Sequence, residues 1–137
     1  MSNSRFAVAT HILTGIALNS EKGLVSSDYL ASSVNTNPVV VRRIIQDLVR
    51  VGLLRGKPGK GGGSELALPP DKINLFQVYQ AVQTGPLFDF NPNVPNKKCP
   101  LSCRMKELLE PVFESVDKGL EDNLKKIHIQ DLIQDMR

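Results

Sequence analysis

The chain has 137 residues, enough for one domain with an appended element, and its formal net charge is +3. With only two cysteines and no run of about 18 apolar residues, it fits neither a secreted disulfide scaffold nor a membrane-spanning protein. The N-terminal residues show no signal-peptide pattern, so we expect a cytoplasmic protein with no membrane partner.

The charge is unevenly distributed along the chain. Residues 36–60 carry six basic side chains and one acidic one, a local charge of +5, whereas residues 104–137 carry six basic and eight acidic ones. A basic segment suits the phosphate backbone of a nucleic acid, because binding it releases condensed counterions. Ordinary solvated surfaces also show such an excess, so charge alone leaves both interpretations open.

Three helices are predicted in the first 52 residues. Apolar residues at helical spacing over residues 6–17 indicate an amphipathic first helix. Ser26 and Ser27 mark the start of a short second helix, and Asn37 and Pro38 mark the start of a third, which Gly52 ends. The third helix is basic on its outer face. The pair predicts a helix-turn-helix, although an ordinary helical hairpin shows the same pattern.

Two short extended segments follow, residues 53–55 and 64–68, around a glycine-rich loop that carries Lys57 and Lys60. Three helices followed by a hairpin is the order of a winged helix, and the loop would be the wing, whose lysines can meet phosphates. The loop lacks the glycine spacing of a nucleotide-binding P-loop, so we reject a nucleotide site. The predicted fold class is mainly α with a small β-hairpin wing (α+β).

The second half of the chain predicts a fourth helix near residues 74–84, a loop and a long helix. From residue 101 to 127 apolar residues keep steps of three and four, and Pro111 is expected to kink this helix or mark its true start. So long a stripe favours packing on a second copy of the chain, and folding back on its own core is the alternative. A last short helix is predicted over residues 129–136.

The sequence resembles the Rrf2 family of bacterial winged-helix regulators over nearly its whole length. The resemblance begins in residues 33–45, with their Asn-Thr-Asn-Pro phrase, and continues through Leu48, residues 51–54, the loop 56–63 and the strand 66–68. It also includes residues 71–75, 78–82 and 127–132. It looks closest to the branch that carries Asn-Thr-Asn-Pro before the recognition helix. It implies a homodimer with a winged domain at each end, bound to double-stranded promoter DNA. We divide the chain into a DNA-binding winged domain (1–84), a loop with the cysteines (85–103) and a dimerisation region with the C-terminal helix (104–137).

The resemblance places the contacts with DNA on the third helix and on the wing. Arg42 and Arg43 present planar forks of donors, suited to guanine or phosphate, but adjacent helical positions are about 100° apart, so both cannot point ideally into one groove. Val39 and Val40 suit thymine methyl groups, and the wing lysines suit phosphates. The candidate contact residues are Ser27, Thr36, Asn37, Val39, Val40, Arg42, Arg43, Arg55, Lys57 and Lys60.

In many family members three cysteines in the loop hold an iron–sulfur cluster, whereas this sequence has only Cys99 and Cys103. We therefore expect no cofactor, since thiolate clusters normally need four ligands. Three interpretations stay open: remnants of a cluster site, a thiol site that forms a disulfide or reacts with an oxidant or electrophile, or a metal site. A helix start and nearby basic residues favour a reactive thiolate at Cys103. A disulfide requires Cys99 to lie in the loop, because an i, i+4 pair in a regular helix is near the distance limit.

These observations predict a sequence-specific DNA-binding transcriptional regulator, a homodimer that acts as a repressor and responds to redox or thiol chemistry. The alternative is a protein-interaction adaptor that uses the winged-helix dimer without specific DNA binding. The sequence shows no Ser/His/Asp set, no His-Glu-x-x-His motif and no recognisable pair of carboxylates, so we do not expect an enzyme.

Overall fold

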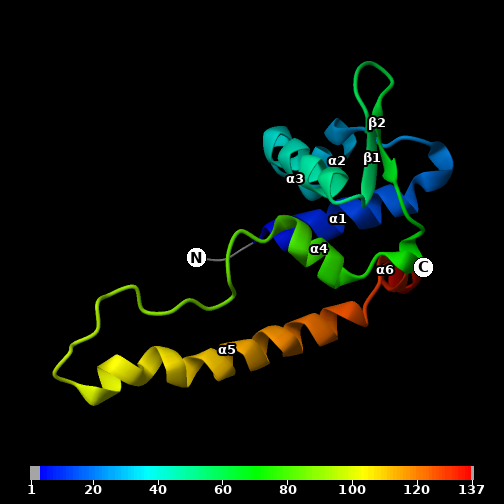
Figure 1. The fold of residues 1–137 in the computed structure, drawn as a ribbon. Coiled ribbons are helices and arrows are strands. Elements are labelled where there is room, and N and C mark those ends of the chain that lie inside the picture. Colours follow the sequence, from blue (N-terminus) through cyan, green and yellow to red (C-terminus); the bar gives the residue numbers. More distant parts are fainter. Residues whose placement is uncertain (1–3, 137) are drawn as a thin grey trace. The chain divides into compact units, whose positions relative to one another are not determined.

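The computed structural model describes residues 4–136, which form two compact units (Figure 1). One unit joins the chain up to Gln83 with the segment from Leu124 onward, and the other is Thr84–Asn123. The elements are, in chain order, α1 (Arg5–Leu18), the 3-10 turn η1 (Ser20–Lys22), α2 (Ser27–Val34), α3 (Pro38–Arg50), β1 (Leu54–Lys57), β2 (Gly63–Leu66), the 3-10 turn η2 (Pro70–Lys72), α4 (Leu75–Val82), α5 (Pro100–Lys125) and α6 (Ile129–Met136). The predicted fold class, mainly helical with one antiparallel β-hairpin, is confirmed.

The starts of α2 and α3 are set by the polar side chains that precede them, as predicted. The Ser26 hydroxyl accepts a hydrogen bond from the Tyr29 N–H at 3.1 Å, and the Asn37 side-chain oxygen accepts one from the Val39 N–H at 2.8 Å. Each bond satisfies a backbone donor that has no partner inside its helix. Pro38 fills the first position of α3, where its missing N–H costs nothing.

The wing differs from its predicted limits. The strands are Leu54–Lys57 and Gly63–Leu66 rather than residues 53–55 and 64–68, because the antiparallel register pairs Leu54 with Leu66 and Lys57 with Gly63. Lys57 therefore lies in a strand and not in the loop. Gly63 is required where it stands: it has a φ of 155°, and a Cβ there would lie 2.6 Å from the carbonyl oxygen of Val25. Val25 and Ser64 exchange two backbone hydrogen bonds, which tie the hairpin to the segment before α2.

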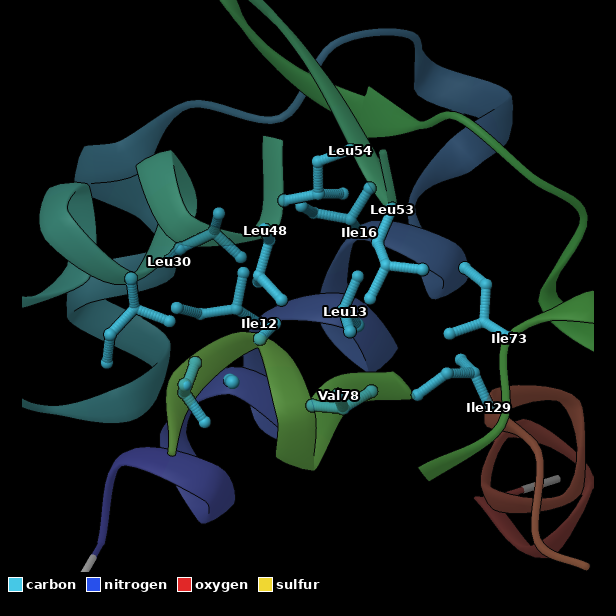
Figure 2. Close-up of a cluster of buried hydrophobic side chains, with 14 of the residues drawn as sticks. Ile12, Leu13, Ile16, Leu30, Leu48, Leu53, Leu54, Ile73, Val78 and Ile129 are labelled. Carbon is cyan, nitrogen blue, oxygen red and sulfur yellow. The ribbon is translucent and has the colours of Figure 1, made fainter. Parts of the chain in front are cut away.

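The core of the first unit is built around α1. Figure 2 shows side chains of α1 pointing toward those of α2, α3, β1 and α4, and the cluster reaches Ile73 and Ile129 next to α4 and α6. These residues are buried because each helix turns its apolar stripe inward, which is the pattern that the spacing over residues 6–17 predicts. The fully buried members include Ile12, Leu13, Ile44, Leu48, Ile73, Val78 and Ile129.

The C-terminal helix α6, predicted over the same residues, is tied to the first unit by backbone hydrogen bonds as well as by packing. The Leu75 N–H donates to the Ile127 carbonyl at 2.8 Å, and the Ile129 N–H donates to the Ile73 carbonyl at 2.9 Å. Ile129 is fully buried. The residues beyond the long helix therefore belong to the first unit, which contains the wing and is called the winged unit.

The second unit consists of a loop and most of α5. The helix begins at Pro100, earlier than the expected end of the loop at residue 103, because proline is tolerated in the first turn of a helix. It runs without interruption through Pro111, so that proline does not mark its start. None of the 26 residues of α5, all of which the structure describes, is buried. No helix within residues 4–136 is long and apolar enough to span a membrane.

Candidate nucleic-acid interface

Helix α3 has one buried face and one exposed polar face. Val41, Ile44 and Leu48 are fully buried, whereas Arg42, Arg43, Gln46 and Arg50 are exposed. This division follows from steps of three and four residues, which return a side chain to the same face of a helix. The buried face attaches α3 to the core and holds the basic face toward solvent.

A groove of about 820 Å³ lies between α3, the start of α2 and the hairpin. Residues of the third helix and of the wing, the two elements that the resemblance predicts to contact DNA, line this one groove. From the candidate contact set, the groove is lined by Ser27, Arg42, Lys57 and Lys60.

Three cations face this groove without an internal counterion. Within residues 4–136, neither Arg42 nor Lys57 nor Lys60 forms an ion pair, and each is exposed. Unpaired cations on two adjacent elements make a positive strip that attracts phosphate groups. The opposing charge in the groove comes from Asp28, in the first turn of α2.

The remaining candidates lie outside the groove. Arg43 is exposed but does not line the pocket between α3 and the hairpin. Which of the two adjacent arginines points into a DNA groove stays a prediction. Val39 and Val40 are 44% and 38% exposed in the first turn of α3. Thr36 is half-buried, and the side-chain oxygen of Asn37 is engaged in the helix cap.

Arg55 is held on the hairpin itself. Its guanidinium lies 3.7 Å from the Glu65 carboxylate and donates to the Leu66 carbonyl at 3.4 Å. Both groups are more than half exposed, so the pair contributes little to stability. Arg55 therefore differs from Lys57 and Lys60, for which no ion pair is present within residues 4–136.

Two polar residues of the groove are missing from the predicted contact set. Gln46 and Arg50 line it together with Arg42. The three are spaced four residues apart, which places them in one row along the helix. That spacing is visible in the sequence, but only the position of the hairpin shows that this row lines the groove.

The single acid of the basic segment is used to anchor α3. The Asp47 carboxylate accepts a hydrogen bond from Arg5 of α1 at 2.5 Å and lies 3.1 Å from the Arg50 guanidinium. Arg5 also donates to the carbonyl of Val82 at 3.3 Å, at the end of α4. Asp47 is 19% exposed, and its charge is directed toward Arg5 and Arg50 rather than toward the lysines of the wing.

Comparison with known families shows which protein family has this sequence and fold. The sequence model of the Rrf2 family, described as an iron-dependent transcriptional regulator, matches residues 2–135. The chain belongs to the Rrf2 family. The members of that family are transcriptional regulators, which confirms the expectation that this protein is not an enzyme. Its place in the Asn-Thr-Asn-Pro branch stays a prediction.

Individual relatives match this Rrf2 regulator over nearly its whole length. YwnA of Bacillus subtilis (strain 168), which its name classes as an HTH-type transcriptional regulator, is 42% identical over 134 residues and 97% of each chain. A crystal structure of a protein described as DNA-binding is 37% identical, with a TM-score of 0.76 over 95% of this chain and 99% of that one. A protein from Lactobacillus plantarum, classed as a transcriptional regulator, has a TM-score of 0.82 at 26% identity, over 97% of this chain and 89% of its own.

The iron in the family description does not fit the donors of this chain. Residues 4–136 contain no group of three or more His, Cys, Asp or Glu side chains placed to hold a metal ion. Cys99 lies just before α5 and Cys103 in its first turn, and both thiols are free. Two thiolates are fewer than the four ligands that iron–sulfur clusters normally take. The donors of the described residues therefore do not suit an iron ion or an iron–sulfur cluster.

Proposed function

We propose that this Rrf2 regulator is a repressor that binds operator DNA as a homodimer in the cytoplasm, where bacterial promoters lie. Helix α3 enters the major groove, and the hairpin follows the adjacent backbone. The observation that carries the proposal is the α3–hairpin groove, in which Arg42, Lys57 and Lys60 form no ion pair with any other residue of the described range 4–136. A phosphate backbone supplies the missing negative charge.

The exposed residues of α3 are suited to separate tasks in this mode of binding. Val39 and Val40, in the first turn, offer apolar contact to thymine methyl groups. Arg42 offers a bidentate fork to guanine from the same helix. Asn37 serves mainly through its cap, which orients the N-terminal turn toward the DNA.

The dimer is supported by the apolar stripe of α5. Its side chains follow steps of three and four residues, and each is between 36% and 58% exposed. An apolar stripe of this length in water favours association, and two-fold symmetry sets the same face of each helix against the other. The stripe consists of Leu101, Met105, Leu108, Val112 and Val116.

The response to thiol or redox chemistry is assigned to Cys99 and Cys103. Cys99 lies just before the first residue of α5, a position that a bond between the two sulfur atoms requires, and its carbonyl accepts a hydrogen bond from the Cys103 N–H at 3.2 Å. A matched test compares DNA affinity before and after mild oxidation in the native protein and in Cys103→Ser. Loss of affinity confined to the native protein supports a disulfide switch, and equal affinities in all four samples contradict it.

Replacing both Lys57 and Lys60 by alanine tests the groove. Two lost phosphate contacts should lower affinity for all DNA sequences and reduce the slope of log affinity against log salt by about two. Fluorescence anisotropy with DNA from upstream of the protein's own gene, at several salt concentrations, measures both quantities. Lys22→Ala with Lys72→Ala removes the same charge from residues that do not line the groove, and should leave the slope unchanged.

The two arginines provide a second, sequence-dependent test. Arg42→Ala should reduce the preference for the specific site over random DNA by about 1–3 kcal/mol, the value of one bidentate contact to a base. Arg43→Ala, outside the groove, should leave most of that preference intact. Binding that is weak, insensitive to salt and unchanged by these substitutions would contradict DNA recognition and favour a protein-interaction adaptor.

A further inference from the structure

A second pocket, of about 440 Å³, lies entirely within Thr84–Asn123, between the loop and the first turns of α5. This volume falls within the range of about 300–1,000 Å³ that is typical of small-molecule sites. Its walls are mostly apolar and include Phe90, Val94, Met105 and Leu109. Two chemically active side chains, Cys99 and Lys106, also line it.

The pocket distinguishes the two cysteines. Cys99 is half-buried and lines the pocket, whereas Cys103 is exposed and does not. The Cys103 sulfur lies 3.6 Å from the Asn96 carbonyl oxygen, to which its S–H donates. Of the two thiols, only Cys99 therefore adjoins an apolar surface on which an organic molecule can be seated.

Lys106 supplies a positive charge to the same pocket. Its ammonium lies 5.4 Å from the centre of the Phe90 ring, which holds it over an aromatic wall. Phe90 is in turn packed against Phe113 of α5, with ring centres 5.0 Å apart. The pocket thus combines a nucleophile, a cation and a flat aromatic surface.

We infer that this pocket binds small apolar carbonyl compounds with a conjugated carbon–carbon double bond, such as quinones, and that Cys99 adds to them. The aromatic wall suits a planar apolar body, and Lys106 suits the carbonyl oxygen. This class of ligand is the one whose chemistry uses all three features together.

The addition needs no further reactant. The Cys99 sulfur forms a bond to the β-carbon, and the π electrons of the double bond move toward the carbonyl oxygen as an enolate beside the Lys106 ammonium. The proton that the thiol releases returns, through water, to the α-carbon or, for a quinone, to oxygen. The net change is addition of S–H across the conjugated system.

Any effect of the adduct on transcription rests on the proposed function, but adduct formation does not. The test therefore measures adducts on the full-length protein in the absence of DNA. Failure of DNA binding leaves its result unchanged, and failure of the adduct leaves the DNA-binding proposal in place.

The experiment compares two probes that share one reactive group, N-phenylmaleimide and N-(2-hydroxyethyl)maleimide. Cys103→Ser reports on Cys99, and Cys99→Ser reports on Cys103. Intact-protein mass spectrometry gives the rate of each reaction. We expect the phenyl probe to be favoured at Cys99 roughly tenfold more than at Cys103, as burial of part of one phenyl ring predicts. Equal preference at the two cysteines, or no reaction at Cys99, overturns the inference.

Two aromatic variants separate the pocket from the general packing of the loop. Phe88 and Phe90 both contact the Phe113 ring, with centroid distances of 5.7 and 5.0 Å, but only Phe90 lines the pocket. In the Cys103→Ser background, Phe90→Ala should abolish most of the phenyl preference, and Phe88→Ala should keep it. The same loss in both variants contradicts a specific role for the pocket.

Discussion

The two units of the molecule use apolar side chains in opposite ways. All 19 buried apolar residues of the described chain lie in the winged unit, and no residue from Thr84 to Asn123 is buried. The winged unit therefore buries many of its hydrophobic residues in its own core, whereas the second unit leaves most of an amphipathic helix exposed to water.

The difference shows how one chain can carry both a self-contained fold and an exposed apolar helix face, on which the proposed dimer rests. In the second unit, Phe88 and Phe90 cover Phe113 on one side of α5. The neighbouring side, which includes Leu108 and Val112, has no such cover and is about half exposed. An apolar helix face left in water, in a chain that also contains a stable core, is expected where a second copy completes the structure.

The largest effect is expected from a substitution at the centre of the α5 stripe, where the contrast between the two units is greatest. Leu108→Glu should dissociate the proposed dimer, because the lost burial of about 1.5–3 kcal/mol counts once in each subunit. Sedimentation equilibrium should show a dissociation constant raised at least about a hundredfold.

Glu110→Gln is the matched control for this substitution. It lies two positions further along α5, about 200° around the helix from the stripe. It should leave association unchanged. A native protein that is monomeric at every concentration, or a Leu108→Glu variant that associates normally, would contradict the contrast between the two units.

Substitutions in the core of the winged unit should have the next largest effect, on the free energy of unfolding. Leu13→Ala removes a fully buried side chain at the centre of the cluster in Figure 2 and should lower the free energy of unfolding by about 2–5 kcal/mol. Leu18→Ala, in the same helix but 40% exposed, should cost about 1 kcal/mol or less. Urea denaturation measures both, and equal losses would mean that burial does not distinguish the two positions.

The smallest effect is expected at the cap of α3. Asn37→Ala should lower the free energy of unfolding by about 1 kcal/mol, because the Val39 N–H loses its acceptor. Asn37→Ser keeps an oxygen in the capping position and should recover most of that loss. A serine variant as unstable as the alanine variant argues against the capping role, and one with native stability but weakened DNA binding indicates a direct contact by Asn37.

Local chemistry explains why much of the fold could be predicted. Helix starts at Ser27 and Pro38 follow from side chains that satisfy nearby backbone donors, and these bonds span only a few residues. The hairpin was predicted in kind but not in its limits, since its register depends on pairing between residues six to twelve positions apart and on the bridge to Val25. The start of α5 was missed by a few residues because no cap marks it as clearly.

Within the candidate site, the sequence indicated that α3 and the hairpin take part, but not which of their residues line the groove. It predicted that Arg42 and Arg43 cannot both point ideally into one DNA groove, but not which of the two lines the groove beside the hairpin. That choice depends on which face of α3 is buried against α1 and on where the hairpin lies, and both are long-range contacts. The same contacts bring Gln46 and Arg50 into the groove.

By itself, the amino-acid sequence determined the helices, the winged order, the basic middle segment and the family, because each depends on local pattern or on residues met in order along the chain. Only the tertiary structure decided which cations share a groove, that Asp47 is directed to Arg5, and that Cys99 rather than Cys103 adjoins a pocket. These properties arise from contacts between residues distant in sequence or from the path of a loop, and side-chain packing selects among the arrangements that the pattern alone allows.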